Sequence, residues 1–126
     1  MPGKKILLVD DEESIRKTFL LLLKDKYRIT AAKDAEEALD KPKNSYDLVI
    51  ADLRLPGKDG VELVSEMRQR GYRGEVILIS AHAELVDPSI LGRLRIGHFF
   101  AKPLDLNAIS RSIDYLLAKD EGAARI

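Results

Sequence analysis

The chain has 126 residues, the size of one ordinary domain and too few for two independent hydrophobic cores. Its 21 lysines and arginines balance 21 aspartates and glutamates, so no overall field would draw it to nucleic acid or to an anionic membrane. Cysteine is absent, which excludes disulfide scaffolds, thiolate zinc sites and thiol nucleophiles and makes the reducing cytoplasm the expected location.

The first part of the chain predicts two strands, each followed by a helix. Ile6–Val9 is a continuous apolar run, which is typical of a parallel strand covered on both faces. Apolar residues at helical spacing follow from about Glu12 to Asp25. A weaker strand is expected at Tyr27–Ala31, and Asp34 with Glu37 then forms a capping box that starts a second helix.

The middle of the chain repeats this order with stronger signals. Leu48–Ala51 and Val76–Ile79 are again continuous apolar runs and predict strands. Between them, Asp59 and Glu62 have the spacing of a capping box ahead of an apolar stripe, which predicts a third helix.

The last part of the chain predicts a weak helix, a strand and a strong helix. Asp87 followed by Pro88 matches a helix start, but Gly92 lies inside that helix and predicts a marginal one. The aromatic pair at residues 99–100 predicts the fifth strand. Asp105 can cap a final helix with apolar residues at regular helical spacing.

Strands that alternate with helices in this way predict an open α/β sheet, and right-handed crossovers put helices on both of its faces. No linker or repeat divides the chain, so residues 1–120 are expected to form one domain and residues 121–126 a polar tail or the start of a linker. No apolar run approaches the ~18 residues of a membrane span.

Polar residues stand directly after four of the five predicted strands, where ligands bind in such sheets. They are Asp10 and Asp11, Asp52, Ser80, and Lys102 with Pro103. Carboxylates this close repel one another by roughly 4 kcal/mol per pair at an effective dielectric of about 20, and one lysine cannot neutralise them. An all-oxygen site of this kind favours Mg²⁺.

A carboxylate beside Mg²⁺ can act as a nucleophile toward phosphorus, with the lysine and the serine binding the phosphoryl oxygens. Each residue also has a plainer interpretation. Asp10 and Asp11 could cap the first helix, Ser80 could be a loop hydroxyl, and Lys102 could be a solvated strand end. The interpretation as a metal and phosphoryl site depends on these residues occurring together at four strand ends. The Lys102–Pro103 bond could be cis.

These motifs resemble the receiver domain of two-component response regulators over nearly the whole chain. They are Ile6-Leu7-Leu8-Val9-Asp10-Asp11-Glu12, Asp52-Leu53-Arg54-Leu55-Pro56-Gly57-Lys58-Asp59-Gly60, Ile79-Ser80-Ala81 and Phe99-Phe100-Ala101-Lys102-Pro103. The resemblance implies a flavodoxin-like doubly wound fold with a five-stranded parallel sheet in the order 2-1-3-4-5.

The resemblance also implies a role for each site residue. Asp52 would accept a phosphoryl group from a phosphohistidine on a sensor kinase or a phosphotransfer protein. Mg²⁺ would be bound by Asp11, Asp52 and the backbone carbonyl of Arg54, with Asp10 acting mainly through water. Ser80 and Lys102 would bind phosphoryl oxygens, and Ser80 and Phe99 would form the switch.

The resemblance further implies a phosphorylation-activated switch, not an enzyme that turns over a metabolite. An effector or a second copy would recognise the face formed by the fourth helix, fifth strand and fifth helix, without direct contact to nucleic acid or membrane. The chain departs from the common pattern between Glu84 and His98, with Pro88, Gly92, and Arg95-Ile96 where Gly-Ala is usual, so an irregular fourth helix is expected. Two alternatives stay open: a receiver-like binding module that needs no phosphate, and a metal-dependent phosphatase, although the latter usually carries D-x-D after its first strand.

Overall fold

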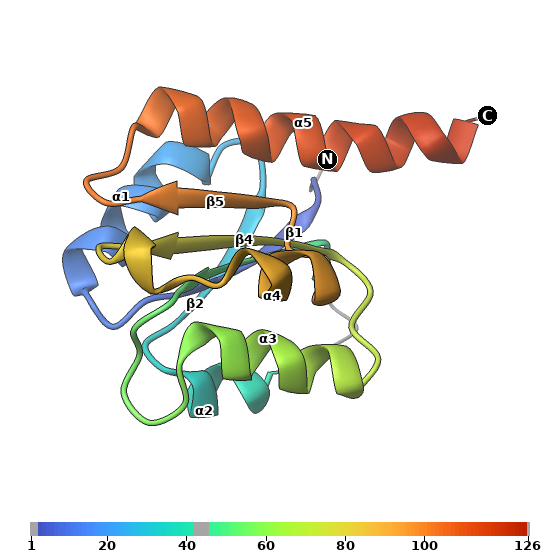
Figure 1. Cartoon of the computed structure of the whole chain (residues 1–126). Coiled ribbons are helices and arrows are strands. Elements are labelled where there is room, and N and C mark those ends of the chain that lie inside the picture. The colour runs from blue at the N-terminus through green and yellow to red at the C-terminus, as the bar shows by residue number, and fades with distance from the viewer. Residues whose placement is uncertain (1–2, 42–45, 126) are drawn as a thin grey trace.

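Strands and helices alternate along the chain in the computed structural model, which describes residues 3–41 and 46–125 (Figure 1). The strands are β1 (Lys5–Val9), β2 (Arg28–Ala32), β3 (Leu48–Asp52), β4 (Glu75–Ser80) and β5 (His98–Ala101). The helices are α1 (Glu13–Leu23), α2 (Ala35–Leu39), α3 (Gly60–Gln69), α4 (Pro88–Arg93) and α5 (Leu106–Arg125), with a short 3-10 turn at Ala83–Leu85.

The five strands form one parallel sheet in the order β2-β1-β3-β4-β5, which confirms the predicted topology. The register places Val9 opposite Ala51, Asp52 opposite Ile79, and Ser80 opposite Ala101. All five strands therefore end at the same edge of the sheet, and the residues that follow them are brought together there.

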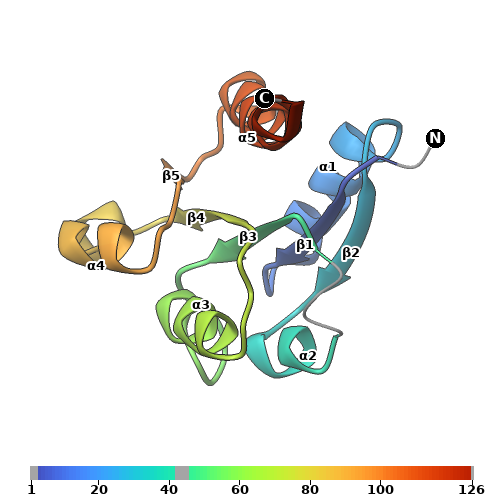
Figure 2. The same cartoon turned by 90° about the vertical axis from the view of Figure 1, so that its right-hand side faces the viewer.

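Helices cover both faces of the sheet, as expected. Figure 2 shows α1 and α5 on one face and α2, α3 and α4 on the other. Alternate residues of each central strand point into the two layers between sheet and helices. Ile50 of β3 packs in the α1/α5 layer with Phe19 and Ile113, whereas Val49 packs in the other layer with Leu63 and Met67. Burial on both faces explains why the central strands are continuously apolar.

The predicted helix starts are present, with one difference in detail. Asp59 and Glu62 form the complete reciprocal capping box at the start of α3. At α2 the Asp34 carboxylate accepts the amide N–H of Glu37, but the Glu37 carboxylate accepts from Lys33 and not from Asp34. The box expected there is thus only half formed.

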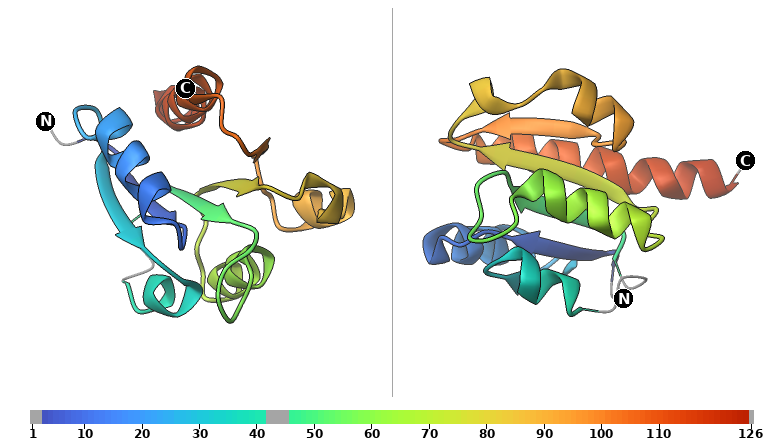
Figure 3. Two further views of the ribbon diagram at one scale, coloured as in Figure 1. Left: turned by 90° about the vertical axis from the view of Figure 1, so that its left-hand side faces the viewer. Right: turned by 60° about the horizontal axis from the view of Figure 1, so that its bottom comes forward.

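The last two helices differ greatly in length. The start of α4 is capped by the Asp87 side chain with Pro88 in its first turn, and the helix has six residues, which agrees with the marginal helix predicted. By contrast, α5 has 20 residues and continues through Arg125, into the segment expected as a tail (Figure 3). No helix in the described part of the chain is both long and apolar enough to cross a membrane.

Candidate metal centre at the carboxyl edge of the sheet

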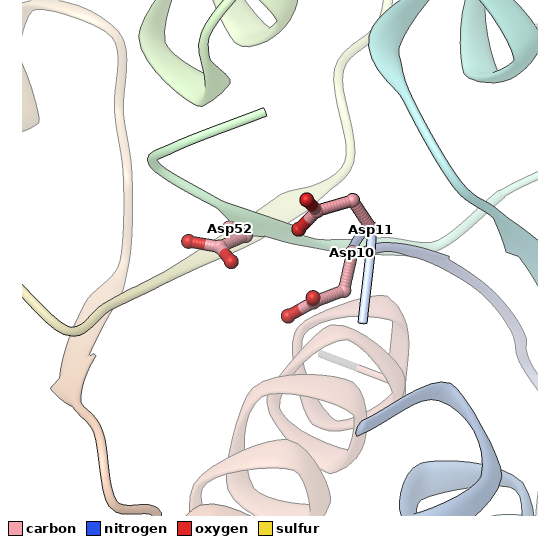
Figure 4. Close-up of side chains that lie close together, drawn as sticks. All are labelled: Asp10, Asp11 and Asp52. Carbon is pink, nitrogen blue, oxygen red and sulfur yellow. The ribbon is translucent and has the colours of Figure 1, made fainter. Parts of the chain in front are cut away.

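Three carboxylates meet where β1 and β3 end. Asp10 and Asp11 follow β1, and Asp52 is the last residue of the neighbouring β3. One ligand oxygen from each lies within 4.8 Å of the others, and Figure 4 shows the side chains gathered at this edge. Asp10 is fully buried and Asp52 is 4% exposed, while Asp11 is open to solvent. The clustering predicted from the strand ends is therefore present.

Lys102 supplies the positive charge of this cluster. It follows β5, and its Nζ donates to Oδ2 of Asp52 at 2.8 Å and lies 3.2 Å from Oδ2 of Asp10. The peptide bond between Lys102 and Pro103 is cis, which agrees with the expectation from the sequence. Burial would lower the pKa of Lys102, but its hydrogen bonds to Asp52 and Glu12 and the nearby carboxylate charges raise it above its usual range. The side chain is a permanent cation.

Asp10 is the most deeply buried carboxylate of the cluster. Its Oδ1 accepts the amide N–H of Glu12 at 2.9 Å. Its buried Oδ2 has the ion pair with Lys102 but no hydrogen-bond donor among the residues that the structure describes. Burial raises the pKa of Asp10 to about 6, and the neighbouring charge of Asp52 adds to this rise, against the lowering effects of the Glu12 amide and Lys102. A buried carboxylate oxygen without a donor is a good ligand for a cation.

Asp52 faces an open hollow. Its Oδ1 accepts the amide N–H of Arg54 at 3.2 Å, which leaves the Oδ2 side to Lys102. The hollow has a volume of about 300 Å³, and its lining residues are Asp11, Glu12, Asp52, Arg54, Ala81, His82 and Lys102. A small anion the size of a phosphoryl group can reach Asp52 from this side.

The two expected switch residues lie behind the hollow, not on its wall. Ser80 ends β4 and is fully buried, and its Oγ accepts the amide N–H of His82 at 2.8 Å. Phe99 pairs with Leu78 across the β4–β5 ladder and is half-buried against the α3/α4 layer. Neither side chain contributes to the lining of the hollow.

The plainer interpretation of the two acids after β1 is not supported by the geometry. The residue before α1 is Glu12, whose own side chain makes no capping hydrogen bond. Asp10 accepts from the amide of Glu12, which lies outside the first turn of the helix. The Asp10 side chain therefore does not cap α1, and it lies with Asp11 in the carboxylate cluster.

Sequence reasoning missed one residue of this site. Glu12 accepts a hydrogen bond from Nζ of Lys102 at 2.7 Å, so the lysine is shared by carboxylates of Asp10, Glu12 and Asp52. Glu12 is the third acid of the run that follows β1, but no local pattern predicts that its side chain reaches Lys102.

This donor set fits a hard dication such as Mg²⁺. Three carboxylates converge, and among the described residues the buried Oδ2 of Asp10 has only the ion pair with Lys102. This single lysine cannot balance the negative charge. The fold and this edge together define a doubly wound, flavodoxin-like domain with an acidic site at the carboxyl ends of its strands.

Comparison with known proteins identifies the family. Residues 6–114 match the model of the response regulator receiver domain. The chain is 34% identical over 122 residues to sporulation initiation phosphotransferase F of Bacillus subtilis, covering 90% of this chain and 93% of that protein. The chain therefore belongs to the response regulator receiver domain family, as its motifs indicated.

Other relatives are longer. The alkaline phosphatase synthesis transcriptional regulatory protein PhoP of Bacillus subtilis is 32% identical over 124 residues, which cover 97% of this chain and 52% of PhoP. The chain thus spans about half the length of that relative.

Solved structures agree with the fold. The CheY-like receiver domain protein of Methanospirillum hungatei superimposes with a TM-score of 0.88 at 24% identity, covering 96% of this chain and 98% of that one. The response regulator protein TrrA of Thermotoga maritima, solved in complex with Mg²⁺ and BeF, has a TM-score of 0.78 at 33% identity, covering 90% and 99%. The acidic cluster of this chain suits Mg²⁺ as in receiver domains.

Proposed function

We propose that this chain is a phosphorylation-activated switch in which Asp52 accepts a phosphoryl group from a phosphohistidine of a sensor kinase or phosphotransfer protein. The observation that carries the proposal is the environment of Asp52. Its carboxylate is nearly buried, lies 2.8 Å from the Lys102 ammonium, and borders a hollow of about 300 Å³ that admits a phosphoryl group.

The transfer uses the carboxylate of Asp52 as nucleophile. One of its oxygens bonds to phosphorus while the bond from phosphorus to the imidazole nitrogen of the donor breaks, and that nitrogen keeps the electron pair. Lys102 already points at Asp52 and would donate to an oxygen of the arriving group. Ser80 directly precedes Ala81, which lines the hollow. After a small movement its hydroxyl would donate a hydrogen bond to an oxygen of the phosphoryl group.

Asp10, Asp11, Asp52 and the backbone carbonyl of Arg54 are the proposed ligands of Mg²⁺, with Asp10 acting mainly through water. Bound there, Mg²⁺ would neutralise charge on the phosphoryl oxygens during transfer. Two observations support this assignment: among the described residues the buried Oδ2 of Asp10 is contacted only by the Lys102 ammonium, at 3.2 Å, and ligand oxygens of the three carboxylates lie within 4.8 Å of one another. The complex of TrrA with Mg²⁺ and BeF supports it by analogy.

The switch would connect this site to the face formed by α4, β5 and α5. Ser80 and Ala101 are paired at the ends of β4 and β5, and Phe99 lies two residues before Ala101. A shift of Ser80 toward a phosphoryl group would leave room that the half-buried Phe99 ring can fill. An effector or a second copy would then recognise the altered face, in a cytoplasmic setting and without direct contact to nucleic acid or membrane.

The proposal is tested by mixing the chain with Mg²⁺ and acetyl phosphate and measuring its intact mass. The parent should gain one phosphoryl group and Asp52→Ala should gain none. Asp25→Ala is the matched control, because Asp25 is an exposed carboxylate in the turn after α1. A parent that stays unmodified, or an Asp52→Ala chain that is modified, would contradict the proposal.

The same samples test the two alternatives. A module that signals without phosphate should neither bind Mg²⁺ in a titration nor gain mass. A metal-dependent phosphatase should hydrolyse a phosphomonoester through many turnovers, whereas the switch proposed here catalyses only its own phosphorylation and dephosphorylation.

A further inference from the structure

A second hollow lies at the opposite edge of the sheet from Asp52. Its volume is about 420 Å³, and its lining residues are Arg68, Gly71, Tyr72, Arg73 and Arg95. It lies between the end of α3 and the turn after α4, beside the starts of β4 and β5; in Figure 1 both helices end on the right, away from the arrowheads of these strands. The hollow therefore shares no residue with the acidic site.

The three arginines in this hollow carry positive charges that no carboxylate within ion-pair distance balances in the described part of the chain. The chain as a whole has equal numbers of basic and acidic residues, so this hollow is a local excess of positive charge. Burial lowers the pKa of Arg68 most, and the like charge of Arg95 lowers it further. The negative charge of Glu75 raises this pKa, but by less than Arg95 lowers it. The arrangement thus concentrates like charge on one spot.

Arg68 is the structural member of the group. Its guanidinium donates to the carbonyls of Leu94 and Arg95 after α4 and to those of Tyr72 and Gly74 after α3. These four hydrogen bonds connect the segment after α3 to the segment after α4, which form the two walls of the hollow. They use carbonyl acceptors only, so the positive charge of Arg68 remains in the site.

Arg73 and Arg95 are the members available to a ligand. Both residues are exposed, and within residues 3–41 and 46–125 neither side chain has a recorded hydrogen bond or ion pair. Arg95 also has a φ of +56°, a left-handed conformation that glycine adopts at far lower cost. The chain thus has a long cationic side chain at a backbone position that disfavours any side chain, and strain of this kind is concentrated at functional positions.

Guanidinium groups bind phosphate and carboxylate groups through paired, charge-assisted hydrogen bonds. A hollow of this size is in the range of small-molecule sites, and its open, cationic lining excludes an apolar ligand. Gly71 also lines the hollow, and no atom lies within 4 Å of the position that a Cβ would take there, so the backbone leaves this part of the hollow open.

We infer that the hollow lined by Arg68, Arg73 and Arg95 binds a small polyanion that carries at least two phosphate or carboxylate groups. Arg73 and Arg95 hold these groups from opposite walls, and Arg68 keeps the walls in place. Because the site borders α4, a bound anion would connect the ends of α3 and α4.

The test titrates the full chain, free of Mg²⁺ and at constant ionic strength, with inorganic pyrophosphate and separately with citrate, recording ¹H–¹⁵N spectra. Saturable shifts should concentrate at residues 71–74 and 95–97, and not at residues 10–12 and 52. The anion that binds more tightly identifies phosphate or carboxylate as the preferred group. Without Mg²⁺ the acidic edge repels both probes, so a failure here is separate from a failure of phosphorylation at Asp52.

The variants separate specific binding from diffuse charge. Arg73→Gln and Arg95→Gly should each weaken binding about tenfold, the loss expected for a charge-assisted hydrogen bond. Arg95→Gly also relieves the left-handed residue, so Tm should not fall, and weaker binding cannot be attributed to unfolding. Arg111→Gln removes an exposed arginine from α5 as the control and should leave binding unchanged. Equal weakening in all three variants, or no saturable binding by the parent, would overturn the inference.

Discussion

Lys102 donates to Glu12 across 90 positions of sequence, with 2.7 Å between Nζ and Oε1. This contact is as short as the 2.8 Å contact of Lys102 with Asp52, although Glu12 is mostly exposed and Asp52 is nearly buried. The single ammonium is therefore divided between the proposed phosphoacceptor and an acid that is not a proposed metal ligand. Glu12 draws part of the positive charge away from the position where Mg²⁺ would bind.

Glu12→Gln should weaken Mg²⁺ binding by roughly two- to fivefold, the size of an exposed ion pair. The neutral side chain leaves Lys102 wholly to Asp10 and Asp52, where its charge competes with Mg²⁺. Isothermal titration calorimetry gives the dissociation constant. Glu13→Gln is the control, because Glu13 is a more exposed neighbour whose carboxylate lies 3.3 Å from Lys17. Tighter binding by Glu12→Gln would refute this description of the charge balance.

Lys102→Met should separate metal binding from phosphorylation. Removing the competing cation should tighten Mg²⁺ binding, yet the rate of phosphorylation by acetyl phosphate should fall about 10²-fold, as expected when one donor to a transferring group is lost. Calorimetry and time-resolved intact mass measure the two effects. Lys33→Met alters an exposed lysine before α2 and should change neither. Parallel losses in metal affinity and rate would mean that Lys102 supports the fold more than the reaction.

The metal-free chain should become more stable as the pH falls from about 7.5 to 5. The pKa of Asp10 is raised from 3.8 to about 6 in the folded chain, chiefly by burial, so the folded state holds a proton that the unfolded state releases. The stability linked to this proton is present at low pH and lost as the pH rises through about 6, and it amounts to at most about 3 kcal/mol. Urea unfolding at each pH measures it.

The variant Asp10→Asn separates the pH dependence of stability caused by Asp10 from that caused by other carboxylates. Asp114, whose hydrogen bonds to Tyr27 and Lys26 lower its pKa despite the opposing effect of burial, loses stability as the pH falls and so acts in the opposite direction. The difference between parent and Asp10→Asn cancels that contribution. The variant should be more stable than the metal-free parent at pH 7.5, and the gap should narrow as the pH falls through about 6 and close below about pH 4. A gap that does not vary with pH would rule out titration of Asp10.

Two glycines inside helices should respond oppositely to alanine. A Cβ on Gly60 would lie 2.4 Å from the backbone oxygen of Asp52, so Gly60→Ala should cost about 1–3 kcal/mol and slow phosphorylation by displacing the end of β3. Gly92 has nothing within 4 Å, and Gly92→Ala should stabilise the chain by up to about 1 kcal/mol through helix propensity. Urea unfolding compares both with the parent. A neutral Gly60→Ala would mean that α3 can move away from β3 without cost.

Local signals were sufficient for most of the fold. Continuous apolar runs predicted β3 and β4, and the spacing of Asp59 and Glu62 predicted the start of α3. Both signals are local because burial and capping depend on a few neighbouring residues. The strand order came from the resemblance and not from these patterns. The length of α5 was not predicted, since its polar end was attributed to a tail although the helix runs through Arg125.

The residues of the candidate site that directly follow strands could be predicted from the sequence. Contacts between long side chains from distant parts of the chain could not. Asp10 and Asp52 could be brought together because parallel neighbours end at one edge. The contact of Glu12 with Lys102 depends on where two long side chains meet, which no local pattern encodes. The arginine hollow is similar, because Arg68 joins the ends of two helices through tertiary contacts.

The parallel ladder that joins β1, β3 and β4 gives the members of the acidic site unequal tolerance to mutation. The spacing between Asp10 and Asp52 is set by main-chain pairing, which every residue type except proline can supply, so drift in the surrounding apolar residues leaves it intact. Lys102 and Glu12 meet only through the tips of flexible side chains and have no such protection. Selection can therefore change the charge around Asp52 quickly while Asp52, the proposed acceptor, stays in place.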